Sequence, residues 1–177
     1  VPLIRKARDM GFETHVFAWE DGAVGREFCD RFYPVSIIEK DEILSIAAKL
    51  DPAAVVSIGS DLASITVNYL AEKLGLPGNT MRCSTLTTNK FLMRERLAER
   101  GVLCPGFVKH TSGTGSIDAN HLKYPLIIKP VDRSGSRGVT KIETMFEMSD
   151  AISRAITESF AGECVIEEFV TGKEYSV

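Results

Sequence analysis

The first 80 positions combine apolar residues at helical spacing with short uninterrupted apolar runs. Apolar residues three or four positions apart predict helices over 2–10, 41–50 and 62–75. Segments rich in β-branched and aromatic residues predict strands over 13–19, 33–38 and 54–59. This order of helices and strands is typical of an open α/β sheet.

The last of these strands, Ala54–Gly59, is a continuous apolar run of the kind found in parallel strands that are covered on both faces. It is followed by Ser60 and Asp61, for which two interpretations stay open. Either residue can cap the helix that follows. Alternatively, both can bind a ligand, because ligands of such sheets bind at the carboxyl ends of the strands.

The second half of the chain mixes two predicted helices with several short strands. The helices span 88–100 and 145–160, and the strands span 106–110, 124–129, 139–142 and 164–170. We interpret the polar sequence TSGTGS at 111–116 as a linker. Two domains are therefore predicted, 1–86 and 87–177.

The sequence IIKPVDRSGSRGV at 127–139 is the main candidate for a binding site. A strand there runs into Lys129, and a loop with Gly135 and Gly138 follows. Glycines allow backbone N–H groups to turn inward and bind an anion, and a lysine beside them adds positive charge. A plain turn is the alternative, because glycine and serine also cluster in turns without a ligand.

The composition excludes several classes of protein but does not identify a binding site. The net charge of −3 argues against a general binder of nucleic acid or membrane surfaces. The four cysteines are widely spaced, which favours free thiols over a zinc site or disulfides, and no apolar run is long enough to span a membrane. We expect a cytoplasmic protein. Position 1 is not methionine and position 177 lies in an apparent strand, so we also expect both ends to be truncated.

In combination, these motifs carry a family resemblance. The strand with Lys129-Pro130, the loop GSRGV, a helix and then IEEFVTGKEY resemble the ATP-grasp superfamily, in the order that the family has them. The branches that the chain resembles are the carbamoyl-phosphate-synthase-like and amino-acid ligases. The resemblance implies a partial preATP-grasp domain, a Rossmann-like open parallel sheet lacking its first strand, followed by the N-terminal α+β lobe of an ATP-grasp domain.

The resemblance also implies roles for individual residues. Lys90 and Lys129 would contact phosphates, and Glu174 would hold the ribose hydroxyls. Glu167 would accept from the adenine amino group, and the backbone of Glu168, Phe169 and Val170 would read the ring edge. The loop over the phosphates would consist of Ser134, Gly135, Ser136, Arg137, Gly138 and Val139. For Arg137, contact with a γ-phosphate or a substrate carboxylate and exposure to water stay open. Family members often have an acidic residue before the first lysine, whereas this chain has Asn89.

The implied function is that of an ATP-dependent ligase that joins a carboxylate to an amine or a thiol through an acylphosphate. No catalytic side chain is predicted, and the Mg²⁺ ligands are expected beyond Val177, so the chain alone should be inactive. The partners would be ATP and small carboxylate and amine substrates, with homo-oligomers possible. The alternatives are a non-catalytic nucleotide-binding module and, more weakly, a dinucleotide-binding Rossmann domain.

Overall fold

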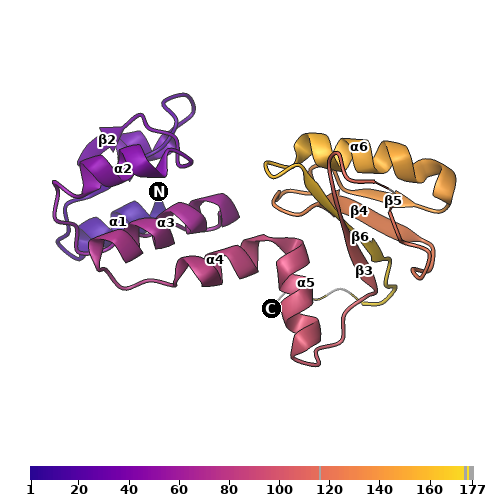
Figure 1. Ribbon diagram of the computed structural model, residues 1–177. Helices are drawn as coiled ribbons and strands as arrows, with labels where there is room; N and C mark the ends of the chain where they lie inside the picture. Colours follow the sequence, from indigo (N-terminus) through magenta and orange to yellow (C-terminus); the bar gives the residue numbers. More distant parts are fainter. Residues whose placement is uncertain (116, 174, 176–177) are drawn as a thin grey trace. The chain divides into compact units, whose positions relative to one another are not determined.

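A computed structural model describes residues 1–115, 117–173 and 175 of the chain. The chain forms two compact units, Val1–Ser84 and Thr85–Val177 (Figure 1). The division between Ser84 and Thr85 lies two residues before the predicted domain boundary. No helix among the described residues is long and apolar enough to cross a membrane.

The first unit packs helices around two short parallel strands. Its elements are α1 (Pro2–Asp9), β1 (His15–Phe17), the 3-10 helix η1 (Val24–Glu27), β2 (Arg31–Tyr33), α2 (Lys40–Ala47) and α3 (Asp61–Leu74). Strands β1 and β2 are parallel, with His15 opposite Arg31. Val35, Ile43 and Leu70 form the centre of the core, because helical spacing turns the apolar faces of α2 and α3 inward.

Two strand predictions in this unit are wrong. The strand predicted over 33–38 ends at Tyr33, because Pro34 has no N–H for a ladder bond, and Val35 packs into the core instead. The segment 54–59 contains no strand, and Val56 and Ile58 are 61% and 78% exposed. A strand needs a hydrogen-bonded neighbour, and among the described strands β1 pairs only with β2. An apolar run shows only that its residues can be buried, and Val56 and Ile58 of this run are not buried.

The second unit is built on a four-stranded sheet with the order β3-β6-β4-β5. Its elements are α5 (Lys90–Glu99), β3 (Phe107–Thr111), β4 (Leu126–Pro130), β5 (Thr140–Ile142), the 3-10 helix η2 (Met145–Glu147), α6 (Met148–Glu158) and β6 (Glu163–Glu168). All of its strand pairs are antiparallel. The predicted strands of this half are confirmed, with ends that differ by one or two residues.

Helix α6 runs along one face of this sheet, as Figure 1 shows. Leu126, Ile128 and Ile166 are fully buried there together with Ala151 and Ala155 of the helix. Strand side chains alternate between faces, so every second residue of β4 and β6 points at α6. The predicted helix over 145–160 ends earlier than expected, and Phe160 lies beyond it as an exposed side chain.

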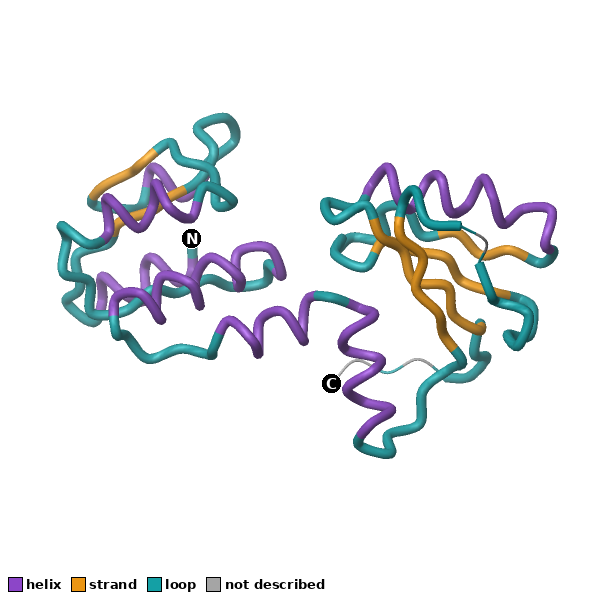
Figure 2. Tube along the Cα trace, viewed as in Figure 1, coloured by secondary structure: helices purple, strands orange, loops and turns teal. Residues whose placement is uncertain are grey.

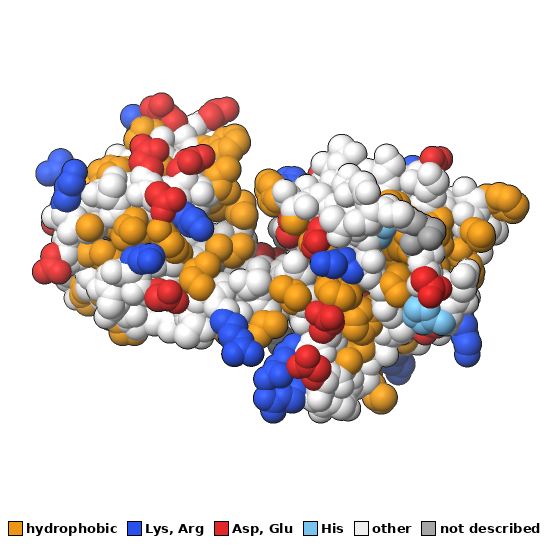
Figure 3. Space-filling view, in the orientation of Figure 1, with side chains coloured by type: hydrophobic (Ala, Val, Ile, Leu, Met, Phe, Trp, Pro, Cys, Tyr) orange, Lys and Arg blue, Asp and Glu red, His pale blue; other side chains and the backbone are white. Residues whose placement is uncertain are grey.

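Helix α4 (Met81–Thr88) was not predicted, and it directly precedes α5 (Figure 2). Its sequence, MRCSTLTT, is rich in serine and threonine, which have low helix propensity, and only Ser84 is buried. Asn89 separates the two helices in an extended conformation. Apolar side chains are also exposed on both units (Figure 3), and the most exposed are Leu103 and Phe146.

Candidate functional site

Lys129 lies on the sheet face opposite α6. Ile128 and Pro130 are buried toward the helix, so alternation along β4 turns Ile127 and Lys129 to the other face. Glu167 of β6 stands directly opposite Ile127 in the ladder and therefore shares that face. The fold thus brings together a lysine and a glutamate that are 38 residues apart in sequence.

Glu167 is bound by two cations. Its side chain is 7% exposed; one carboxylate oxygen accepts from the Lys129 ammonium, and the other accepts from Nε of Arg94 at 3.0 Å. Arg94 was not among the predicted site residues. It lies four positions after Lys90 and thus on the same side of α5, which is the one signal in the sequence that could have identified it.

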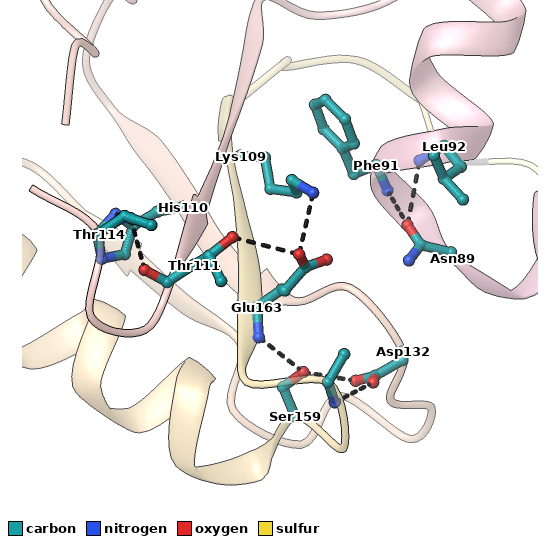
Figure 4. A network of polar contacts seen from close by, with 11 residues as sticks. Asn89, Phe91, Leu92, Lys109, His110, Thr111, Thr114, Asp132, Ser159 and Glu163 are labelled. Atoms are coloured by element: carbon teal, nitrogen blue, oxygen red, sulfur yellow. Dashed lines mark hydrogen bonds and ion pairs between the residues drawn. The ribbon is translucent and has the colours of Figure 1, made fainter.

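The start of α5 is joined to the glycine loop. Asn89 caps the helix, and its side-chain oxygen accepts from the N–H groups of Phe91 and Leu92 at 3.1 Å (Figure 4). The Lys90 N–H donates to the Val131 carbonyl at 2.8 Å, and its ammonium donates to the Arg133 carbonyl at 2.5 Å. Asn89 therefore has a clear structural role: it fixes the helix end that carries Lys90.

The loop itself has the backbone conformation that its glycines favour. Gly135, Ser136 and Gly138 have φ values of 68°, 57° and 68°. None of residues 134–138 donates a backbone hydrogen bond to another described residue, whereas the Val139 N–H donates to the Ser136 carbonyl at 3.4 Å. Ser134 to Arg137 and Val139 are exposed, including the Arg137 side chain. The loop therefore presents N–H groups that no described protein acceptor uses.

Asp132 anchors the start of this loop. Its carboxylate accepts from the Ser159 hydroxyl at 2.8 Å and from the N–H groups of Phe160 and Ala161 at 3.2 and 2.8 Å. Ser159 in turn accepts from the Glu163 N–H at 3.2 Å, which joins the loop to the first residue of β6 (Figure 4). These bonds hold the loop against the turn that follows α6.

Arg133 is a further side chain beside the loop that was not predicted. Its guanidinium lies 4.4 Å from the centre of the Phe160 ring and 3.5 Å from a Glu158 oxygen. Its buried Nε atom has no hydrogen-bond partner among the described residues. Neither contact has a spacing signal in the sequence, because both depend on how the end of α6 and the residues after it pack against the loop.

Glu168 differs from its neighbour Glu167 in direction and in partners. Its carboxylate accepts from the backbone N–H groups of Lys123 at 2.9 Å and Gly106 at 3.4 Å. The bond from Lys123 is the main reason why the pKa of Glu168 is lowered. The backbone N–H groups of Glu168 and Phe169 donate to the carbonyls of Gly106 and Pro125, both at 2.9 Å.

The remaining predicted nucleotide contacts are two exposed residues and one residue that the structure does not describe. Phe169 and Val170 follow β6 and are exposed, and Phe169 stacks under the Lys141 ammonium at 4.5 Å. Glu174 lies outside the described residues. The structure therefore brings Lys90, Lys129, Glu167 and the start of the glycine loop into one region and does not describe the predicted ribose contact.

Ser60 and Asp61 belong to the first unit. The Ser60 hydroxyl accepts from the Ala63 N–H at 3.2 Å, which confirms it as the cap of α3. Asp61 is the first residue of that helix, and both line a cavity of about 400 Å³ that also includes Asn68 and Asn79. Asn68 uses its side chain within the unit, on the Ser84 hydroxyl and the Asn79 N–H.

Comparison with known proteins identifies the part of the chain that carries Lys129, the glycine loop and Glu167. A model of the ATP-grasp domain matches residues 122–177. The D-alanine–D-alanine ligase of Hydrogenovibrio crunogenus is 27% identical over 138 residues, which cover 76% of this chain and 44% of that protein.

Solved structures show the same fold. The L-amino acid ligase of Bacillus licheniformis matches 97% of this chain with a TM-score of 0.75 and 24% identity, and 42% of its own length is covered. The biotin carboxylase domain of the Hydrogenobacter thermophilus 2-oxoglutarate carboxylase, solved with MgADP and bicarbonate, matches 96% with a TM-score of 0.73 and 17% identity, over 41% of that chain. The chain therefore spans less than half the length of these relatives.

Proposed function

We propose that this chain, which belongs to the ATP-grasp superfamily, is the nucleotide-binding part of an ATP-dependent ligase that joins a carboxylate to an amine or a thiol. The observation that carries the proposal is the convergence of Lys90, Lys129 and the glycine loop on one side of the sheet. Lys90 binds the carbonyl that precedes Ser134, and Lys129 is the next-to-last residue of β4, which leads into the loop.

The phosphate end of the nucleotide would lie at this loop. The loop N–H groups have no acceptor among the described residues, so they are suited to bind phosphate oxygens. Residues in the left-handed conformation turn such N–H groups toward the same side of the loop. Lys90 and Lys129 would add charge-assisted hydrogen bonds. Arg137 is exposed at the tip of the loop, where it would meet a γ-phosphate or the carboxylate substrate.

The adenine end would lie at the end of β6. The N–H groups of Glu168 and Phe169 are already used inside the protein, so the strand would contact the base chiefly through carbonyl oxygens. A carboxylate can accept about four hydrogen bonds, so Glu167 could bind its two cations and still accept from an adenine amino group. Glu174 stays the proposed ribose contact.

The chemistry would be activation of a carboxylate. A carboxylate oxygen attacks the γ-phosphorus of ATP, the bond to the β,γ-bridging oxygen breaks, and ADP leaves. The nitrogen or sulfur of the acceptor then attacks the carbonyl carbon, phosphate leaves, and the acceptor loses a proton. No side-chain nucleophile is needed, since the protein binds and orients the reactants and balances their charge.

The described carboxylates of this site are bound by protein groups and offer Mg²⁺ no open ligand set. No group of three or more acidic, histidine or cysteine side chains comes together among the described residues. Glu167 is bound to two cations and Glu168 to two amides. Mg²⁺ would have to be held by other residues.

The test is a phosphate-release assay with the full-length protein. ATP, Mg²⁺ and a panel of amino acids and other small carboxylates are supplied with amine or thiol acceptors, and ADP, phosphate and the ligated product are measured. Release that depends on one carboxylate would support the ligase. ATP binding without release for any carboxylate would instead favour the non-catalytic nucleotide-binding module.

A further inference from the structure

Glu167 binds two cations, and its contact with Lys129 affects how well that lysine can bind a phosphate. Lys129 is in contact with a carboxylate whose residue is only 5% exposed. A lysine and a glutamate together form a neutral pair, and a phosphate would have to compete with Glu167 for the ammonium group. A neutral pair is a poor anion site.

Arg94 changes this balance. Its Nε binds the second oxygen of Glu167 at 3.0 Å, so the group consisting of Arg94, Lys129 and Glu167 has a net charge of +1. The guanidinium group of an arginine carries a permanent positive charge in proteins. We propose that Arg94 is a positioning residue of the nucleotide site, which offsets the charge of Glu167 so that Lys129 can bind a phosphate. This inference rests on the proposed function.

The position of Arg94 fits this role. Lys90 and Arg94 lie on successive turns of α5, and both side chains point toward the site. Lys90 donates to the Arg133 carbonyl beside the loop, and Arg94 donates to Glu167. Phe91 packs edge-on against Phe107 of β3 at 5.7 Å between ring centres, which holds the helix against the sheet. The Arg94 side chain is 23% exposed, so its charge is only partly screened by solvent.

The experiment compares a charged with an uncharged ligand on the full-length protein. ADP and adenosine share the base and the ribose but differ in their phosphates, and neither is turned over by the ligase reaction. Dissociation constants for both are measured by calorimetry at low salt for the native protein and for Arg94→Gln. Glutamine keeps a side chain that can still donate to Glu167 and removes the charge.

Arg94→Gln should weaken ADP about tenfold and change adenosine less than twofold. This is the effect of one unit charge about 10 Å away at an effective dielectric constant of about 20. Arg94→Lys should restore most of the ADP affinity, because it restores the charge. Arg96→Gln is the matched control, since Arg96 lies on the same helix and pairs with Glu99 at the surface; it should leave both constants unchanged.

A double variant distinguishes the loss of charge in Arg94→Gln from a structural effect of that substitution. Glu167→Gln combined with Arg94→Gln again leaves Lys129 as a single net charge, so the ratio of ADP to adenosine affinity should return to within about threefold of the native ratio. An equal loss of ADP and adenosine binding in Arg94→Gln, with no recovery in the double variant, would overturn the inference and assign Arg94 a structural role.

Failure of the proposed function looks different. If the native protein binds neither ADP nor adenosine, there is no nucleotide site and the ligase proposal itself fails. If the native protein prefers ADP to adenosine and Arg94→Gln keeps that preference, the nucleotide site stands and only the role of Arg94 is refuted.

Discussion

The two faces of the four-stranded sheet differ in almost every respect. The face toward α6 is aliphatic and closed, with Leu126, Ile128 and Ile166 fully buried. The opposite face is charged, and Lys129 lies there in an ion group around the buried Glu167 that Arg94 of α5 completes. Adjacent residues of one strand thus serve different purposes, because alternation sends them to opposite sides.

Glu167 and Glu168 show what this difference means. Glu167 points to the charged face and binds side chains that carry charge. Glu168 binds the backbone N–H groups of Lys123 and Gly106 and so connects β6 to two neighbouring segments. The sequence contains two equal glutamates, and the fold makes one a candidate ligand residue and the other a structural tie.

The largest expected effect comes from creating a cavity in the buried face of the sheet, beneath α6. Ile166→Ala should lower the free energy of unfolding by about 3 kcal/mol, since it leaves a cavity beneath α6. Ile127→Ala changes the same side chain on the charged face, where it is half-buried, and should cost about 1 kcal/mol. Urea unfolding followed by circular dichroism measures both. Equal losses would contradict the distinction between the faces.

The second prediction removes the central cation of the charged face. Lys129→Met should weaken ADP binding about 10- to 100-fold, because it removes one charge-assisted hydrogen bond to a phosphate. Lys109→Met is the matched control, because Lys109 also lies on this face but pairs with Glu163 at 3.0 Å. Calorimetry on the full-length protein decides: if both variants lose ADP equally, Lys129 has no special role at the phosphates.

Much of the charged face was predictable, and the exceptions have physical causes. Lys129, Lys90 and the glycine loop carry a recognisable spacing, and short apolar runs located β4 and β6 to within two residues. Arg94 was missed because a single arginine on a helix looks like a solvated charge until its partner is known. The failed strand over 54–59 shows the converse, since an apolar run becomes a strand only when a neighbour can pair with it.

The third prediction concerns the loop beside the charged face. Gly135 and Gly138 share a φ of 68°, so alanine at either site should cost about 1 kcal/mol in backbone strain. At Gly138 the new Cβ would also lie 3.0 Å from Pro130 Cγ and 3.1 Å from Glu158 Cβ, whereas Gly135 has open space. Gly138→Ala should therefore cost about 1 kcal/mol more than Gly135→Ala in urea unfolding. The same loss at both positions would refute the packing argument.

The smallest expected effect tests Glu168 as a structural tie. Its pKa is lowered chiefly by the Lys123 N–H, so the folded state favours the charged carboxylate, and that contribution is present above the pKa of the unfolded chain. Glu168→Gln should lower the melting temperature at pH 7, and the difference from the native protein should shrink as the pH falls below about 4. Glu99→Gln makes the same charge change at an exposed site on α5 and serves as the control. A difference between Glu168→Gln and the native protein that stays constant from pH 7 to pH 3 would mean that Glu168 stabilises the sheet through packing rather than through its charge.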